Sequence, residues 1–438
     1  MKIIKKNLVY LIILFLVGGG YFLYTKKIEK EKEEKKLIEK RIFFIPEEKV
    51  SYVSIKNGEK KIECFKEKGK WKIKPGNFDA DQEEVKTLID NILKIEKERK
   101  LEGVENLDEF GFGKKNKKIT VGNLGEKFSL IIGEETPTGS YYYGTTDNKN
   151  IFLVSKWNIN DIIEKNVFDL RDKRIIPAKI EKEKIEKIEI KKGRNRYVIE
   201  RKNKKWGIIY PLKDLADRNE VENIISDILE KKVKSFEKKE TGISTSAYIK
   251  FSSEGKEYSL FFGKEKDGKI FAKNSIKPWV FTIDKEILDT LPESIDDLRE
   301  KDVFTFEKEN VVTVEIENKN GKFTLIKKDN NWEFEKSKKK ISKEKVDDFL
   351  DDLKFIEIDK FLKFSKENLK KYGLLNPDIK ITVILPENRK ESIYTGKREK
   401  EKVFCFLPER NVIITISKDD WKTLNKKESD FFEKKGKK

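Results

Sequence analysis

Three tryptophans mark the same alternation of hydrophobic and polar positions at three places in the chain. Before each of them, two short stretches place apolar side chains at every second position, and turn-forming residues such as Asn57-Gly58 and Gly193 separate the stretches. Period-two alternation broken by such turns predicts an antiparallel meander whose third strand begins at the tryptophan. The tryptophans and their alternating pairs are Trp71 with Val53/Ile55 and Ile62/Cys64, Trp206 with Ile188/Ile190 and Tyr197/Ile199, and Trp332 with Val314/Ile316 and Phe323/Leu325.

A helix is predicted ten or eleven residues after each tryptophan. Asp81, Asp217 and Ser342 stand at the three starts, and their side-chain oxygens can accept from the free backbone N–H groups of a first helical turn. Each start is followed by an apolar stripe at i, i+3, i+4 and i+7, which predicts a helix that packs one face on a sheet. The stripes are Val85/Leu88/Ile89/Ile92, Val221/Ile224/Ile225/Ile228 and Val346/Phe349/Leu350/Leu353.

The second half of each unit repeats more loosely. Strand-like runs end in Gly133, Gly263 and Gly396, and a further strand and a closing helix follow each of them. The sequence therefore predicts an α+β fold of three tandem repeats, each an antiparallel sheet packed with amphipathic helices. The predicted modules are residues 47–172, 182–303 and 307–433, each close to the usual size of a domain.

The N-terminus carries the most hydrophobic segment. Residues 8–24 are uncharged and apolar, and as a helix they would span ~25 Å, at the short end for a bilayer crossing. Lysines precede the segment, and no convincing small-x-small cleavage site follows it. We predict a transmembrane anchor over residues 1–24, single-pass in the cytoplasmic membrane, with the N-terminus inside and the modules extracytoplasmic. A cleaved signal peptide is the alternative. Residues 25–46 read as a charged stalk.

Composition narrows the functional classes. The chain of 438 residues has 98 Lys+Arg and 80 Asp+Glu, a formal net charge of +18, but the two signs are interspersed. A phosphate-backbone surface needs clustered charge of one sign, so nucleic acid is disfavoured as a partner. A polyanion-binding surface protein remains an alternative. The absence of histidine removes Ser-His and Cys-His catalysis and imidazole metal ligands.

Few residues suggest chemistry. Cys64 and Cys405 stand where the other copies have apolar or aromatic residues, which favours buried packing over a redox or metal role. The three tryptophans could be ligand platforms, but their fixed place at a strand start favours the core. Asp79 with Asp81 could form the carboxylate pair of a hydrolase, the least favoured function, because capping already explains Asp81. We predict no catalytic, cofactor-binding or metal-binding residue.

One surface is a candidate for partner binding. The loop from Gly133 to Gly144 is rich in glycine and hydroxyl groups, and Tyr141, Tyr142 and Tyr143 stand within it. It lacks the Lys-Ser/Thr ending of a phosphate loop, which favours a turn between strands over an anion cradle.

Several motifs resemble one family. Trp71 to Pro75 with Ala80-Asp81 and Val85, Trp206 to Pro211 with Ala216-Asp217, and Tyr372 to Pro377 resemble the patterns of the bacterial family of unknown function DUF 4340. The resemblance implies an N-terminal membrane anchor and an accessory role beside gliding-type ABC transport systems, with a permease, an ATPase or other envelope proteins as partners. It supplies no catalytic residue. We therefore expect a membrane-anchored, non-enzymatic accessory or scaffold protein of the cell envelope.

Overall fold

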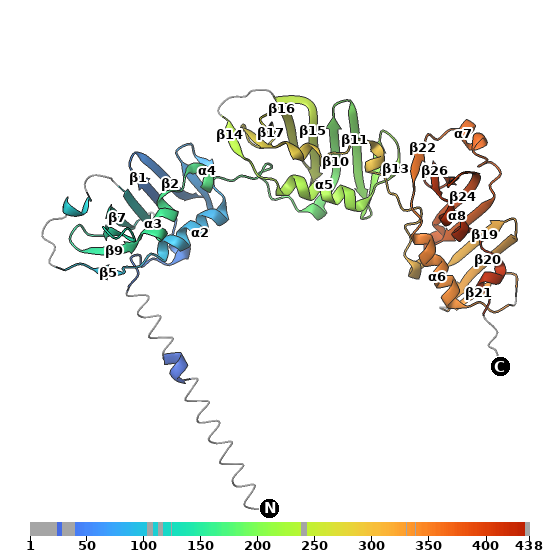
Figure 1. The fold of residues 1–438 in the computed structure, drawn as a ribbon, viewed down its shortest axis with the longest axis horizontal. Coiled ribbons are helices and arrows are strands. Elements are labelled where there is room, and N and C mark those ends of the chain that lie inside the picture. Colours follow the sequence, from blue (N-terminus) through green and yellow to red (C-terminus); the bar gives the residue numbers. More distant parts are fainter. Residues whose placement is uncertain are drawn as a thin grey trace, which may run out of the picture. The chain divides into compact units, whose positions relative to one another are not determined.

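The computed structural model describes residues 24–28, 40–102, 108–112, 117–123, 125–237, 243–329, 331–337 and 339–433. It divides into two compact units, Met1–Lys173 and Arg174–Lys438. The first unit holds one sheet with its helices (module 1), and the second holds two (modules 2 and 3), as Figure 1 shows. Residues 1–23, which contain nearly all of the predicted anchor, lie outside the described residues.

Sheet 1 has nine strands, all antiparallel, in the order β4-β3-β2-β1-β6-β7-β8-β9-β5. Helix α2 connects β4 at one edge with β5 at the other, so the chain crosses the sheet through this helix. The strands are β1 (Tyr52–Asn57), β2 (Lys60–Glu67), β3 (Lys70–Lys74), β4 (Phe78–Asp79), β5 (Arg99–Lys100), β6 (Lys117–Gly122), β7 (Lys127–Glu135), β8 (Tyr141–Thr145) and β9 (Ile151–Ser155). The helices are η1 (Glu47–Lys49), α2 (Gln82–Leu93), η2 (Asp108–Phe110), α3 (Lys156–Ile163) and α4 (Val167–Leu170).

Sheet 2 repeats this order strand for strand, as β13-β12-β11-β10-β15-β16-β17-β18-β14. Helix α5 makes the crossing that α2 makes in sheet 1, and it lies along one face of the sheet (Figure 1). The strands are β10 (Ile185–Lys192), β11 (Asn195–Lys202), β12 (Lys205–Tyr210), β13 (Asp214–Leu215), β14 (Ser235–Glu237), β15 (Ile243–Ser253), β16 (Lys256–Lys266), β17 (Lys269–Asn274) and β18 (Val280–Asp284). The helices are η3 (Lys182–Lys184), α5 (Arg218–Glu230), η4 (Lys285–Leu288) and η5 (Ile295–Asp297).

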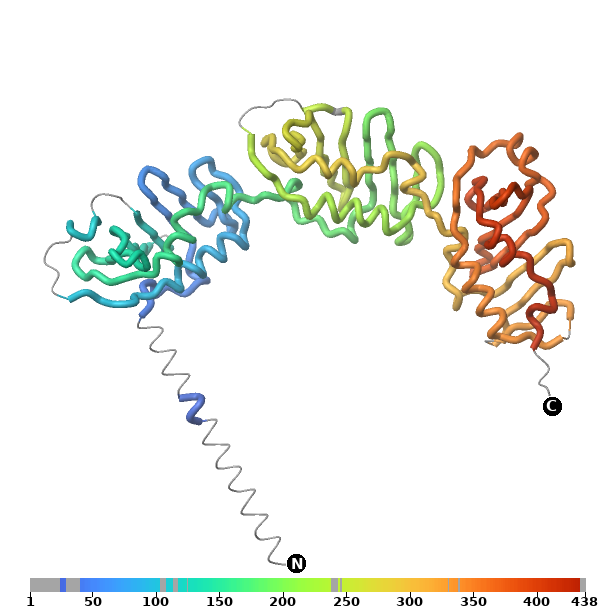
Figure 2. Tube along the Cα trace, in the orientation of Figure 1, coloured from blue at the N-terminus to red at the C-terminus, as the bar shows by residue number. Residues whose placement is uncertain are grey.

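Sheet 3 has eight strands in the order β21-β20-β19-β23-β24-β25-β26-β22. Among the described residues, an isolated bridge between Glu333 and Lys340 stands where sheets 1 and 2 have the short edge strands β4 and β13. The strands are β19 (Thr313–Asn318), β20 (Gly321–Lys328), β21 (Asn331–Phe334), β22 (Lys360–Leu362), β23 (Ile379–Ile384), β24 (Lys390–Glu399), β25 (Lys402–Leu407) and β26 (Val412–Ser417). The helices are η6 (Lys308–Asn310), α6 (Lys343–Lys354), α7 (Lys366–Lys371), η7 (Pro386–Asn388), α8 (Lys418–Leu424) and η8 (Glu428–Phe431). Figure 2 follows the path of the chain through the three sheets. The prediction of three tandem antiparallel sheets packed with helices is confirmed.

The tryptophans and the helix stripes lie in the interiors. Trp71, Trp206 and Trp332 have relative exposures of 6%, 2% and 6%, and the four stripe residues of each crossing helix are buried. Burying a large apolar side chain stabilises a fold by about 1.5–3 kcal/mol, so these positions are major contributors to each module. Their spacing along the sequence follows from the place of each helix against its sheet.

The predicted cap residues lie at the N-termini of the three crossing helices. The Asp81 carboxylate accepts from the backbone N–H groups of residues 83 and 84, and that of Asp217 accepts from residues 219 and 220. The Ser342 hydroxyl accepts from the N–H of Lys345 at 3.4 Å. Each side chain thereby satisfies backbone donors that have no partner within the helix.

A close backbone approach explains why glycine recurs at the end of a strand-like run in the second half of the module. A Cβ on Gly133 would lie 2.2 Å from the carbonyl oxygen of Phe110, and one on Gly396 would lie 2.3 Å from that of Tyr372. Only glycine allows a preceding turn to rest on the strand at this distance. Both glycines lie within irregularities of the strand register, between Ile132 and Glu135 in β7 and between Thr395 and Arg398 in β24.

The described residues contain no helix with the length and hydrophobicity needed to cross a membrane.

Candidate functional site: a charged cleft between two sheets

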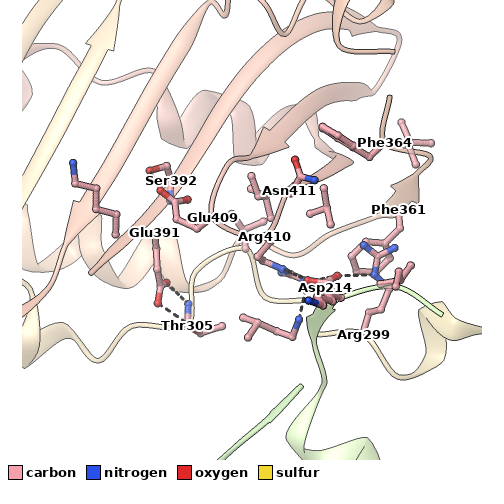
Figure 3. Close-up of a pocket in the computed structure, with 18 of the residues that line it drawn as sticks. Asp214, Arg299, Thr305, Phe361, Phe364, Glu391, Ser392, Glu409, Arg410 and Asn411 are labelled. Atoms are coloured by element: carbon pink, nitrogen blue, oxygen red, sulfur yellow. Dashed lines mark hydrogen bonds and ion pairs between the residues drawn. The ribbon is translucent and has the colours of Figure 1, made fainter. Parts of the chain in front are cut away.

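A large cleft lies inside the second unit, where an edge strand of sheet 2 comes close to an edge strand of sheet 3. Its volume is about 1110 Å³, and side chains of both modules line it. Strand β13 contributes Asp214 and Leu215, and β22 contributes Phe361 and Leu362. The cleft therefore belongs to the pair of modules and to neither module alone (Figure 3).

A buried ionic cluster lies at one end of this cleft. The Asp214 side chain is fully buried, and its two oxygens accept from Arg299 of module 2 and Arg410 of module 3. Arg299 Nε donates to Oδ2 at 2.7 Å, and Arg410 donates to Oδ1 through Nε at 2.8 Å and to Oδ2 through Nη2 at 3.2 Å. The side chains of Arg299 and Arg410 are only 6% and 8% exposed. Charge-assisted hydrogen bonds of this kind are among the strongest in proteins.

The same arginines hold the connection between the two sheets. Arg410, from the turn between β25 and β26, also donates to the backbone carbonyls of Glu300 at 2.7 Å and Asp302 at 3.1 Å. The Arg299 guanidinium lies over the ring of Phe361 in module 3, 3.6 Å from the ring centroid. Sheets 2 and 3 are therefore joined by an ion cluster, by hydrogen bonds to the linking chain and by a cation–π contact.

Two carboxylates at the other end of the cleft bind the protein's own backbone. Glu391 accepts from the N–H of Thr305 at 2.7 Å and from its hydroxyl at 3.1 Å. Glu409 accepts from the N–H of Ser392 at 3.0 Å and from its hydroxyl at 2.8 Å. Figure 3 shows the Glu391–Thr305 pair away from the Asp214 cluster. Both oxygens of each carboxylate are engaged, so these groups stabilise the walls of the cleft.

Positive charge dominates the lining. Seven cationic side chains face four carboxylates, and the carboxylates are bonded as described, with Asp296 accepting from Arg299 at 3.2 Å. Within the described part of the chain, five of the cations have no hydrogen-bonded or ion-paired partner for their side chains. They are Lys205, Lys213, Lys363, Arg389 and Lys390. All five are exposed.

Two acidic residues of the linking segment have perturbed pKa values. Burial raises the pKa of the Glu300 carboxyl above its usual range. Burial, followed by repulsion from Glu357 and Asp217, raises that of Asp302. Both groups therefore hold a proton more tightly in the folded protein than in an unfolded chain.

The tyrosines proposed as a binding surface do not share one face. Tyr142 is 6% exposed and lies in the core of module 1, where its hydroxyl donates to Asn160 at 3.0 Å. Tyr141 and Tyr143 are half-buried, and the Tyr143 ring meets Phe110 edge to face at 4.7 Å. Since side chains alternate along β8, three consecutive tyrosines cannot all point to one surface.

The two cysteines and the two carboxylates considered for catalysis have structural roles. Burial raises the pKa of the Cys64 thiol to about 12 and that of Cys405 well above its usual range, which disfavours the thiolate. Asp81 caps α2, while Asp79 forms an ion pair with Lys72. Among the residues with described positions, no group of three or more potential metal ligands lies together.

Sequence reasoning missed Asp214, Arg299 and Arg410. The sequence did contain a signal for Arg299, a further short motif shared by two modules. Asp169-Leu170-Arg171 near the end of module 1 matches Asp297-Leu298-Arg299 near the end of module 2. The leucines are fully buried and both arginines are nearly so. An arginine held at the same place in two copies predicts a structural partner.

The sequence was also compared with known proteins. The model of a family described as a domain of unknown function (DUF4340) matches residues 71–246, 216–367 and 335–436. The first match runs from module 1 into module 2, the second runs from module 2 into module 3, and the third covers module 3 from just after Trp332. No match to a curated protein was found.

Proposed function

The chain belongs to the DUF4340 family, which has no assigned function, and we propose from its architecture that it is a non-enzymatic, membrane-anchored scaffold of the cell envelope. In this proposal residues 8–24 hold the chain in the cytoplasmic membrane, and the modules stand outside it. Modules 2 and 3 act as one rigid platform for a partner protein. The proposed partner class is an ABC transporter, contacted through its permease, or another envelope protein.

The observation that carries the proposal is the buried junction of modules 2 and 3. Two flexibly linked domains need no fully buried carboxylate held by one arginine from each side. Such a cluster costs desolvation, and in this proposal it is retained because it specifies one arrangement of the two modules. A fixed arrangement keeps the cleft preformed, and preformed surfaces bind partners with less loss of conformational entropy.

Catalysis is a weaker account of the same residues. A carboxylate-based hydrolase needs one acid that carries a proton and one base that is free to act. Glu391 and Glu409 instead accept hydrogen bonds from backbone and hydroxyl groups through both oxygens. Polyanion binding is also weaker, because many lysines are paired with acidic side chains, as Lys308 is with Asp351.

The anchor is tested by fractionating cells that express the full chain. We expect the protein to remain with membranes after an alkaline wash, and a variant lacking residues 1–24 to be released. Protease added outside spheroplasts should digest the modules. Modules protected from that protease would contradict the proposed orientation.

The scaffold role is tested by photo-crosslinking in intact membranes, with a crosslinker placed at Lys363 beside the cleft and, as control, at Lys266 on module 2. We expect one dominant envelope protein to be captured at the first position and not at the second. A chain that stays monomeric and uncrosslinked at both positions would contradict the proposal.

A further inference from the structure

We infer that the cleft between sheets 2 and 3 binds an extended acidic segment of a partner protein. This inference rests on the proposed scaffold function and adds the chemistry of the segment that the cleft recognises. The occupant has carboxylate side chains that meet the basic residues of the cleft, and apolar side chains that meet its hydrophobic wall.

The charges of the lining favour an anionic occupant. Lys205 and Lys213 come from module 2, and Lys363, Arg389 and Lys390 come from module 3. None of the five has an intramolecular partner among the described residues, whereas every carboxylate of the lining already accepts hydrogen bonds. A surface with spare cations and satisfied anions attracts carboxylates and disfavours basic partners.

The apolar wall favours a peptide over a simple polyanion. Leu212, Leu362, Leu385 and Val412 line the cleft, and Phe364 is 39% exposed beside them. Polyphosphate and nucleic-acid backbones have no apolar side chains to bury against these residues. A chain that alternates carboxylates and apolar side chains satisfies both parts of the lining.

A free strand edge favours an extended conformation of the occupant. Strand β22 ends the order of sheet 3 and, within the described residues, pairs through its backbone with β26 alone. Four consecutive lining residues, Phe361 to Phe364, begin in this strand and continue past its end. A peptide that adds as a strand gains main-chain hydrogen bonds there, and alternate side chains then face the cleft.

The inference is tested by selecting peptides from a random display library on the full chain in detergent. We expect the selected peptides to be rich in Asp and Glu that alternate with apolar residues. Their affinity, measured by fluorescence anisotropy, should fall at least about tenfold for the double variant Lys213→Glu/Arg389→Glu. The matched control Arg194→Glu/Lys266→Glu changes the net charge equally on module 2 away from the cleft, and should bind as the wild type does.

Two further measurements sharpen the test. Methylating one of the two alternate sets of backbone nitrogens in a selected peptide should abolish binding, and methylating the other set should leave it intact, because an added strand turns only every second N–H toward the edge it pairs with. Polyphosphate of equal charge should compete poorly at the same ionic strength.

Four results would overturn the inference: selection of no peptides or of basic ones, equal binding to both double variants, undiminished binding of both methylated peptides, or competition by polyphosphate as effective as by the peptide itself. The scaffold proposal would survive any of them if the full chain still crosslinks to an envelope protein through other surfaces. Failure of the inference and failure of the scaffold proposal are thereby distinguishable.

Discussion

Modules 2 and 3 end in the same backbone arrangement, but the side chain at its last position contacts the next module in one case and its own core in the other. Module 2 ends in Asp297-Leu298-Arg299 and module 3 in Asp430-Phe431-Phe432, and in both the third residue forms an isolated β-bridge with the residue before the crossing helix cap. Arg299 bonds to Asp214 and lies over Phe361 of the next module. Phe432 packs on Phe334 of its own module, with ring centroids 5.9 Å apart. One backbone position therefore serves either a junction or a core.

Module 1 also closes with an arginine, but this arginine lies over a ring of its own module. Arg171 follows the buried Leu170, and its guanidinium lies over Phe78 at 3.9 Å. Burial lowers the pKa of Arg171 to about 10, because desolvation destabilises its charged form. Arg171 and Arg299 thus place a buried charge at the closing position, whereas Phe432 extends the hydrophobic interior there.

The largest effect is expected from Asp214→Asn. The change leaves two nearly buried guanidiniums without their common anion, and breaking a buried ion pair in this way costs about 3–5 kcal/mol. Denaturant unfolding should show this loss, with modules 2 and 3 then unfolding in separate transitions. The control Asp296→Asn removes a carboxylate that is 49% exposed and should cost less than about 1 kcal/mol. Equal losses for both variants would show that Asp214 is no special part of the junction.

Phe432→Ala should have a smaller effect that is confined to module 3. The side chain is half-buried, so we expect a loss of about 2 kcal/mol, below that for a fully buried phenylalanine. Hydrogen exchange should accelerate in the strands of sheet 3 while sheet 2 keeps its protection. Acceleration in both sheets would mean that Phe432, like Arg299, supports the junction.

The helix caps should behave alike in modules 2 and 3. Asp217→Ala and Ser342→Ala each remove an acceptor for first-turn N–H groups, and each should cost about 1 kcal/mol in denaturant unfolding. Asp217→Asn keeps a capping oxygen and should be nearly neutral. A loss for Asp217→Asn as large as for Asp217→Ala would assign the effect to the charge of Asp217 and not to its cap.

The smallest effect concerns pH. Because the pKa of Asp302 is raised in the folded protein, ionising it costs stability, and that cost appears as pH rises through the folded pKa. Asp302→Asn removes the cost and should raise the melting temperature at neutral pH. The corresponding gain in the free energy of unfolding should be less than about 1 kcal/mol. The advantage should disappear in acid, where wild-type Asp302 is protonated. A pH-independent gain would point to packing in place of charge.

Local patterns in the sequence predicted the modules well. Trp206, the Val221 stripe and the Asp217 cap depend on neighbours within about a dozen positions, so their periodicity reveals their roles. The short edge strands β13 and β22 have only two or three residues each and gave no alternation to detect. The local sequence pattern therefore did not predict that these two edge strands line a cleft.

The candidate site depends on contacts that no local pattern contains. Asp214 and Arg410 are 196 positions apart, in a chain where charged residues make up 41% of the sequence. An Asp or Arg in such a chain reads as part of a solvated surface, and only burial distinguishes these two. The repeat of Asp-Leu-Arg was visible, but its meaning required the position of Arg299 between two modules.

The most direct test of the account measures the distance between modules 2 and 3 in the full chain. Spin labels at Lys264→Cys and Lys400→Cys, both exposed, report this distance by pulsed electron resonance, and the native cysteines are buried. We predict one narrow distance distribution for the wild-type background and a broad one after Asp214→Asn. A broad distribution in the wild-type background would contradict a junction fixed by the buried cluster.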